Sequence, residues 1–387
     1  MLFRRVQLFR FFGFTVSADA SWIFLSVLIS WTLATYIYPS LHAGYSPEIY
    51  QFMGIATLVG LIASIIAHEV AHAVIAQYYQ MPIAGIVLFF FGGVAEMRGE
   101  PSHPKGEFFM AIAGPIMSVL MGFLFWAGAR LYAQGLGDGP VPQALDYLGN
   151  INMLIAALNM VPAFPLDGGR ALRAIIWHYK NNLVLATRIA SSAGAAFAYL
   201  LLGYACWRIV LNNDMVGGMW SGLLGLFMHG CCTFAVRQTE TRSVLGQERV
   251  SRFMRNDIIT VSPDITITEL VDNFVYKHYQ RSFPVLDRGE LAGFITLQSV
   301  LSVDRHKWHW LHVASVMEAP TEASVIDPDF SAADALDVME QGKRDQLIVA
   351  KARQFLGVVT FRDLVAYTAI TLRVDHNKPV EMSRTAY

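Results

Sequence analysis

The stretch SIIAHEVAHAVIA (Ser64–Ala76) places two histidines and a glutamate, His68, Glu69 and His72, inside an otherwise apolar run. That run covers residues 54–79, and roughly twenty residues are needed to cross a bilayer as a helix. A charged side chain at the bilayer centre costs about 2.5–3.5 kcal/mol. Three neighbouring polar groups in such a segment therefore need an interaction that compensates for this cost.

The composition indicates a membrane protein with a soluble region. The 387-residue chain is 54% hydrophobic and 15% charged, whereas soluble proteins have about 25% charged residues. Charged residues become common only after Val236. The net charge of -1 gives no electrostatic basis for nucleic-acid binding. The three cysteines contain no CxxC pair, so neither a disulfide framework nor a zinc knuckle is expected.

Six apolar segments are expected to cross the membrane, and the first is interpreted as a retained helix rather than a cleaved signal peptide. Basic residues cluster on one side of these segments, which predicts that both termini are cytoplasmic. A short β-rich segment, IAGIVLFFFGGVAEM, is predicted to form a strand or hairpin that dips into the membrane from that side. The six segments are residues 20–39, 54–79, 107–132, 144–163, 184–210 and 216–236.

The soluble region contains an internal repeat. Met254 corresponds to Met317, Pro263–Asp264 to Pro328–Asp329, and Gly293 and Thr296 to Gly357 and Thr360. Each copy is too small to bury its own faces well, so the two are expected to pack as a pair. The expected domains are residues 1–240 in the membrane, two repeats at 241–310 and 311–373, and a tail at 374–387.

The histidine pair predicts a metal site. Residues four apart project from one face of a helix, so His68 and His72 can bind one ion, while Glu69 lies one step around. This is the His-Glu-x-x-His pattern of zinc hydrolases, in which the glutamate is the general base. A chance match is the alternative, but it is less plausible in an apolar span because each polar group there is costly.

A catalytic zinc usually has three protein ligands. The best candidate for the third is Asp167 in NMVPAFPLDGGR (159–170), where two prolines and two glycines break the helix. An ordinary Asp-Gly-Gly turn is the alternative reading of that segment.

These two motifs together resemble the site-2 protease family of intramembrane zinc proteases. The resemblance implies that His68, His72 and Asp167 bind Zn²⁺ and that Glu69 is the catalytic base. It also implies that Asn159 orients substrate or stabilises the oxyanion. The FGG segment resembles the family's membrane-embedded strand edge, so Gly92 and Gly93 are expected to contact an unwound substrate.

The soluble repeat resembles a pair of CBS domains, which commonly bind adenine nucleotides such as ATP, ADP or AMP. Thr360 and Asp363 match the family's Thr-x-x-Asp motif for phosphate and ribose. In the first copy Thr296 is present, but Ser299 occupies the Asp position, which places that nucleotide site in doubt. The alternative is a dimerisation or docking module without a ligand.

The sequence therefore predicts a polytopic α-helical membrane protein with about six transmembrane helices, a short membrane-embedded β segment and a cytoplasmic α/β CBS-domain pair. The predicted function is zinc-dependent cleavage of membrane-embedded or membrane-associated proteins in the cell membrane, that is, regulated intramembrane proteolysis. A homodimer through the CBS pair is plausible. The alternatives are a CBS-gated channel or transporter and a catalytically silent scaffold.

Overall fold

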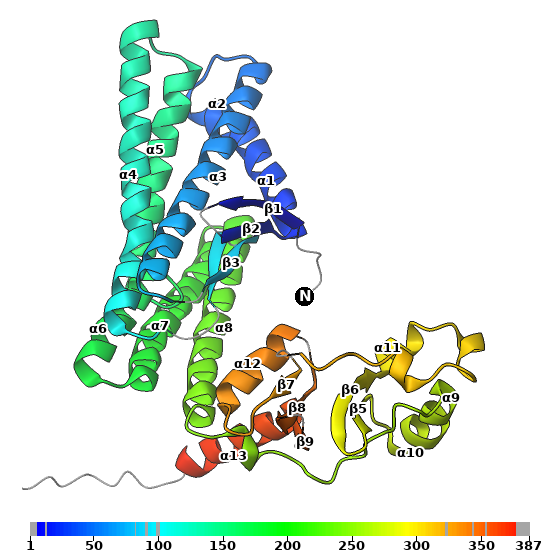
Figure 1. Cartoon of the computed structure of the whole chain (residues 1–387). Coiled ribbons are helices and arrows are strands. Elements are labelled where there is room, and N and C mark those ends of the chain that lie inside the picture. Colours follow the sequence, from blue (N-terminus) through cyan, green and yellow to red (C-terminus); the bar gives the residue numbers. More distant parts are fainter. Residues whose placement is uncertain are drawn as a thin grey trace, which may run out of the picture. The chain divides into compact units, whose positions relative to one another are not determined.

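The computed structural model divides the chain into two compact units, Met1–Thr239 and Glu240–Tyr387 (Figure 1). We refer to them as the membrane unit and the CBS unit. The residues that the structure describes are 6–11, 14–81, 83–89, 92–97, 101–321, 324–342, 344–352 and 354–376.

Long apolar helices dominate the membrane unit. Within the described residues, five helical segments are long and apolar enough to cross a membrane, and they correspond to five of the six predicted spans. The remaining predicted span, 144–163, forms helix α5 (Pro140–Asn159). This helix is 20 residues long but lacks the mean hydropathy of the others, because Asp146, Asn150 and Asn152 interrupt its apolar side chains. The five segments are Trp22–Leu41, Pro47–Tyr78, Pro104–Leu136, Leu183–Leu211 and Met215–Leu245.

The helix boundaries follow from local sequence. The first span is helix α1 (Ala20–Thr32), a π-helical turn (Leu33–Ile37) and α2 (Tyr38–Leu41). Helices α3 (Pro47–Tyr78), α4 (Pro104–Leu136) and α5 each begin with a proline. Proline suits this position because its fixed φ is already helical and its missing N–H would have no helical partner. The remaining helices are α6 (Asp167–Lys180), α7 (Leu183–Leu211) and α8 (Met215–Leu245).

A four-stranded sheet of order β1-β2-β3-β4 accompanies these helices. The predicted hairpin is present as β3 (Ile83–Phe89) and β4 (Gly92–Met97), which pair in antiparallel fashion. Strands β1 (Val6–Phe11) and β2 (Phe14–Ala18) were not predicted, since the opening residues were interpreted as a basic flank of the first span. Strand β2 pairs with β3 in parallel. Strand β4 is therefore one edge of the sheet.

The CBS unit contains the predicted repeat. Its mixed sheet has the order β5-β6-β9-β8-β7, with one hairpin from each copy. The first copy contributes β5 (Ser282–Asp287), β6 (Glu290–Thr296) and the helices α9 (Ile267–Leu270), α10 (Tyr276–His278) and α11 (Leu297–Leu301). The second contributes β7 (Val325–Ile326), α12 (Ala332–Gly342), β8 (Gln346–Lys351), β9 (Gln354–Thr360) and α13 (Phe361–His376).

The two copies exchange their leading segments. Arg255, at the start of the first copy, pairs through its backbone with Val358 in β9 of the second. Glu318, at the start of the second copy, pairs in the same way with Phe294 in β6 of the first. Val250 accordingly belongs to the core of the second copy. Each copy thus completes the other, which explains why the repeat occurs as a pair.

Candidate metal centre

Helix α3 carries the histidine pair on its buried face. His68 and His72 are 6% and 3% exposed, and Glu69 is 7% exposed. The four-residue spacing places the two imidazoles side by side on consecutive turns, nearly perpendicular to one another and with their ring centroids 4.7 Å apart. All three polar side chains of the predicted motif therefore lie inside the helical bundle.

Asp167 is the first residue of helix α6. The chain between α5 and α6 folds tightly against this first turn, because a Cβ atom on Gly168 or Gly169 would overlap the backbone of Met160 or Phe164. Only glycine allows such an approach. A carboxylate at a helix N-terminus is also favoured by the helix dipole. The Asp-Gly-Gly sequence thus directs Asp167 toward α3.

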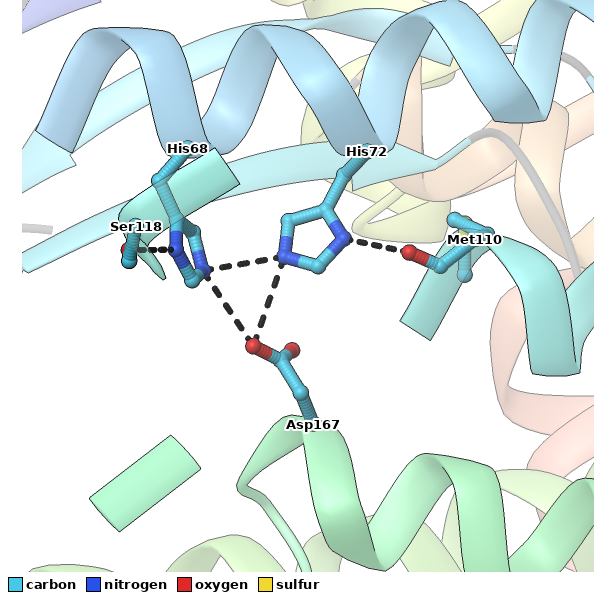
Figure 2. A network of polar contacts seen from close by, with 5 residues as sticks. All are labelled: His68, His72, Met110, Ser118 and Asp167. Carbon is cyan, nitrogen blue, oxygen red and sulfur yellow. Dashed lines mark hydrogen bonds and ion pairs between the residues drawn. The ribbon is translucent and has the colours of Figure 1, made fainter. Parts of the chain in front are cut away.

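Three potential ligand atoms converge at this point (Figure 2). The Oδ2 atom of Asp167 lies 3.2 Å from Nε2 of His68 and 3.4 Å from Nε2 of His72. The two Nε2 atoms are 3.1 Å apart. Zinc–ligand bonds of about 2.0–2.2 Å in a tetrahedron give ligand–ligand separations of about 3.3–3.6 Å. The donor set and its spacing therefore fit a zinc ion.

The other ring nitrogens are held by helix α4 (Figure 2). Nδ1 of His72 lies 2.6 Å from the backbone oxygen of Met110, and Nδ1 of His68 lies 2.8 Å from Oγ of Ser118. A carbonyl oxygen can only accept, so Nδ1 of His72 carries the proton. In the neutral imidazole, Nε2 then has a free lone pair for a metal. Such contacts orient the ligands of a metal site.

Gly114 of α4 has no side chain, so the space in front of both imidazoles stays open. A Cβ atom at this position would stand within 3.0 Å of the Nε2 atoms of His68 and His72. The glycine therefore keeps open the volume toward which the potential ligand atoms point, as expected for an ion site.

A buried ion pair links α4 to the helix that carries Asp167. Nε of Arg173 donates to Oε1 of Glu107 at 2.7 Å, and NH2 of the same guanidinium contacts the same oxygen. The Arg173 guanidinium also lies 5.5 Å from the ring centroid of Phe164, in the segment leading into α6. Both charged side chains are almost completely buried.

The other predicted residues of the membrane unit lie on separate elements. Asn159 is the last residue of α5 and is partly buried. Gly92 and Gly93 begin the edge strand β4, where they pair with Phe89 and Leu88 of β3.

In the CBS unit, Thr360 and Asp363 are joined at the start of α13. The hydroxyl of Thr360 donates to Oδ2 of Asp363 at 2.7 Å, and the backbone N–H of Asp363 donates back to that hydroxyl. Arg255 forms an ion pair with the other carboxylate oxygen. Burial by itself would raise the pKa of Asp363, but the hydrogen bonds from Arg255 and Thr360 and the charges of Arg255 and Arg362 lower it overall.

The equivalent residues in the first copy, Thr296 and Ser299, form the same hydrogen bonds with each other, but the charged residue beside them is acidic rather than basic. Oγ of Thr296 lies 2.6 Å from Oγ of Ser299, whose backbone N–H donates to Thr296 at 3.0 Å. The Ser299 hydroxyl contacts Oε1 of Glu318 at 3.1 Å. Glu318 thus stands where the other half has Arg255.

A cavity of about 480 Å³ opens between the two copies. Pro320, two residues after Glu318, is part of its wall, so the cavity lies beside the Glu318 half. Its other lining residues are Leu291, Ala292, Val325, Ala350 and Ala352.

The sequence interpretation noted Gly114 only as part of the family resemblance and assigned no supporting role to the residues on α4. Glu107, Met110, Gly114 and Ser118 follow a spacing of three and four residues, which marks one helix face. This spacing could have identified the four residues as one helix face. It could not have shown that the face contacts the histidines and α6, because those contacts depend on how the helices pack.

A His-Glu-x-x-His helix joined by an aspartate from a second helix, in a unit with five candidate membrane spans, defines an intramembrane metallopeptidase. Residues 56–139 and 138–201 match the family model of Peptidase family M50, and residues 250–306 and 313–369 match that of the CBS domain. This confirms the predicted enzyme class and domain types. The family implies zinc as the metal.

The chain is similar to several named proteins. The chain is 28% identical over 361 residues to "Putative zinc metalloprotease Rip3" of Mycobacterium tuberculosis, covering 93% of this chain and 91% of that protein. It is 27% identical over 288 residues to "Zinc metalloprotease MJ0392" of Methanocaldococcus jannaschii, covering 74% and 80%. Among solved structures, the "Site-2 Protease from Methanocaldococcus jannaschii" aligns with a TM-score of 0.42 and 24% identity, covering 60% of this chain and 95% of that chain.

Proposed function

We propose that His68, His72 and Asp167 hold a catalytic zinc ion with which the enzyme cleaves peptide bonds of membrane-embedded or membrane-associated proteins. One observation carries the proposal. His68 and Asp167 are 99 residues apart in the sequence, yet their side chains come together with that of His72. The three potential ligand atoms lie within 4.8 Å of one another. A zinc ion shared by Asp167 and the histidines would offset the cost of burying these charged and polar groups in an apolar bundle.

The bound zinc ion would supply a Lewis acid that polarises the scissile carbonyl and acidifies water. In this proposal Glu69, next to His68 on α3, accepts the proton of the attacking water. It then delivers that proton to the leaving amine nitrogen. The Asn159 carboxamide donates a hydrogen bond to the carbonyl oxygen as negative charge develops there.

The substrate would bind along strand β4. A peptide bond within a helix is shielded by helical hydrogen bonds, so the substrate must unwind before cleavage. A sheet edge offers replacement partners to the freed N–H and C=O groups. Gly92 and Gly93 lie on this edge strand, and the absence of side chains at both positions leaves room for the substrate backbone to approach.

We further propose that both termini and the CBS unit are cytoplasmic, because Arg and Lys gather on one side of the spans. A reporter fused to the C-terminus tests this orientation. The homodimer through the CBS pair also stays a prediction, which the mass of the detergent-solubilised particle would test.

A second candidate function is adenine nucleotide binding by the CBS unit, which would link proteolysis to the energy state of the cell. The supporting observation is the cluster of Arg255, Thr360 and Asp363. Arg255 offers a cation to phosphate, and the Asp363 carboxylate can accept hydrogen bonds from ribose hydroxyls. Glu318 in the other half would repel phosphate.

The zinc content of the detergent-purified full-length protein tests the main proposal. We expect about one zinc per chain in the wild type, as in other catalytic sites, and little in Asp167→Asn. The matched control is Asp138→Asn, which changes an exposed aspartate of the same unit. Normal zinc content in Asp167→Asn would contradict the proposed ligand set.

Cleavage by Glu69→Gln tests the proposed base. This variant should keep its zinc but cut co-expressed single-span proteins about 10²–10⁴-fold more slowly, the range for loss of a general base. Termini mapped by mass spectrometry would report the cleavage. Undiminished cleavage by Glu69→Gln would remove Glu69 from the mechanism.

A further inference from the structure

Glu107 and Arg173 form a buried ion pair between the helix that supports the histidines and the helix that begins with Asp167. We propose that this pair is a positioning device for the third metal ligand. It holds α6 against α4 so that Asp167 reaches the two imidazoles. This inference rests on the proposed metal site.

Glu107 lies on the α4 face that supports the metal site. Met110, Gly114 and Ser118 follow it by three, seven and eleven residues, and residues at this spacing share one helix face. Met110 and Ser118 contact the histidine rings, and Gly114 leaves the space in front of them. The same rigid face therefore orients two of the potential ligands and carries the carboxylate that contacts α6.

Arg173 constrains α6 together with the segment before it. It follows Asp167 by six residues, or about 9 Å along a helix. Two atoms of its guanidinium contact one oxygen of Glu107, and its face covers the ring of Phe164. The Phe164 carbonyl in turn accepts a hydrogen bond from Sγ of Cys232 in α8. A shift of Arg173 would thus move both the start of α6 and the chain that enters it.

The burial of the pair strengthens the electrostatic attraction between its two charges. The side chains of Arg173 and Glu107 are 6% and 0% exposed, so water and salt screen the interaction little. Arg208 and Asp214 form another ion pair of the membrane unit, but their side chains are 32% and 35% exposed. That pair contacts none of the potential metal ligands among the described residues, so it serves as the control.

The test compares zinc affinity with the stability of the metal-free protein. Full-length wild type, Glu107→Gln and the apolar pair Glu107→Leu/Arg173→Met are purified in detergent and stripped of metal. Zinc affinity is measured by competition with a chelator, and thermal unfolding of the metal-free protein is followed in parallel. The apolar pair removes both charges of the ion pair at once, whereas Glu107→Gln removes only one, so the apolar pair is the second variant to use if Glu107→Gln does not fold.

We expect both variants to bind zinc about 10–100-fold more weakly, the range for groups that orient metal ligands. The control, Asp214→Asn, should bind zinc like the wild type. If the variants unfold at lower temperature but bind zinc as tightly as the wild type, the pair is only structural and the inference is wrong. If the wild type itself binds no zinc, the proposed metal site fails and the inference fails with it.

Discussion

The candidate metal centre of the membrane unit and the Arg255 cluster of the CBS unit are assembled in similar ways but differ in burial. Each joins side chains about a hundred residues apart in sequence: 99 between His68 and Asp167, and 108 between Arg255 and Asp363. The side chains of His68 and Asp167 are 8% and 12% exposed. Arg255 and Asp363 are 62% and 19% exposed.

Burial determines how strongly each cluster depends on its neighbours. In the membrane unit, the second nitrogen of each histidine also has a partner, Ser118 or the Met110 carbonyl, and the surrounding bundle is apolar. Because these groups are buried, solvent replaces a displaced partner less readily there. At Arg255, solvent competes for every contact and screens the charges. The same kind of substitution should therefore have large effects at the metal centre and small effects in the CBS unit.

The largest contrast is expected for Gly114→Ala. The new methyl group would stand within 3.0 Å of both Nε2 atoms, so zinc affinity should fall about a hundredfold or more, beyond the usual range for groups around a metal site. The helix itself should not suffer, because alanine is favoured over glycine in helices by about 1 kcal/mol. Chelator competition and thermal unfolding of the metal-free protein measure the two effects separately.

Gly128→Ala is the matched control for this substitution. Gly128 lies on the same helix, and among the described residues its added Cβ would meet only Leu145, at an ordinary 3.7 Å. Unchanged zinc affinity in Gly114→Ala would mean that the imidazoles can retreat, which would contradict the rigid support attributed to Ser118 and Met110.

The sequence predicted the parts of these sites that depend on local geometry. His68 and His72 face one side because a helix dictates it, and Asp167 was identified because prolines and glycines break the chain around it. Glu107 and Arg173 were not predicted as a pair. Their contact depends on the packing of α4 against α6, which no local pattern specifies.

Two further features of the structure were not predicted from the sequence. Strands β1 and β2 were missed because arginines near the N-terminus suggested a membrane-flanking segment. The parallel pairing of β2 with β3 depends on the tertiary structure, which no local pattern specifies. The opposite charges of Arg255 and Glu318 could have been identified, since each follows the matched methionine of its repeat, Met254 or Met317. Their exchange between the two copies became apparent only in the structure.

A smaller effect is expected when the two halves of the CBS pair are compared. Arg255→Ala should weaken ATP or AMP binding to the full-length protein about tenfold, as expected for one lost charge-assisted hydrogen bond. Glu318→Ala should leave binding unchanged or tighten it, because it removes a carboxylate rather than a cation. Equilibrium dialysis with labelled nucleotide measures both.

The opposite result would place the nucleotide in the other half. The cavity between the copies lies beside Glu318. The available volume therefore favours the half with Glu318, whereas the positive charge of Arg255 favours the other half. If Glu318→Ala weakens binding and Arg255→Ala does not, the cavity rather than the arginine determines the site. Absence of nucleotide binding in the wild type would remove nucleotide regulation and leave the peptidase proposal untouched.

The smallest effect is expected from the pH dependence of the Arg255–Asp363 pair. Folding lowers the pKa of Asp363 below its ordinary value of 3.8. A lowered pKa adds stability that is complete above the unfolded pKa and is lost as the pH falls through the folded one. Asp363→Asn should therefore lower the thermal stability of the CBS unit more at pH 6 than at pH 2. The exposed arginine limits the difference to about 0.2–1 kcal/mol, the range for solvent-screened pairs.

Melting curves at the two pH values, with Asp264→Asn as an exposed control, measure this difference. A loss that is equal at both pH values would mean that Asp363 stabilises the unit through the hydrogen bond from Thr360, which an asparagine oxygen in another rotamer no longer accepts, rather than through its charge.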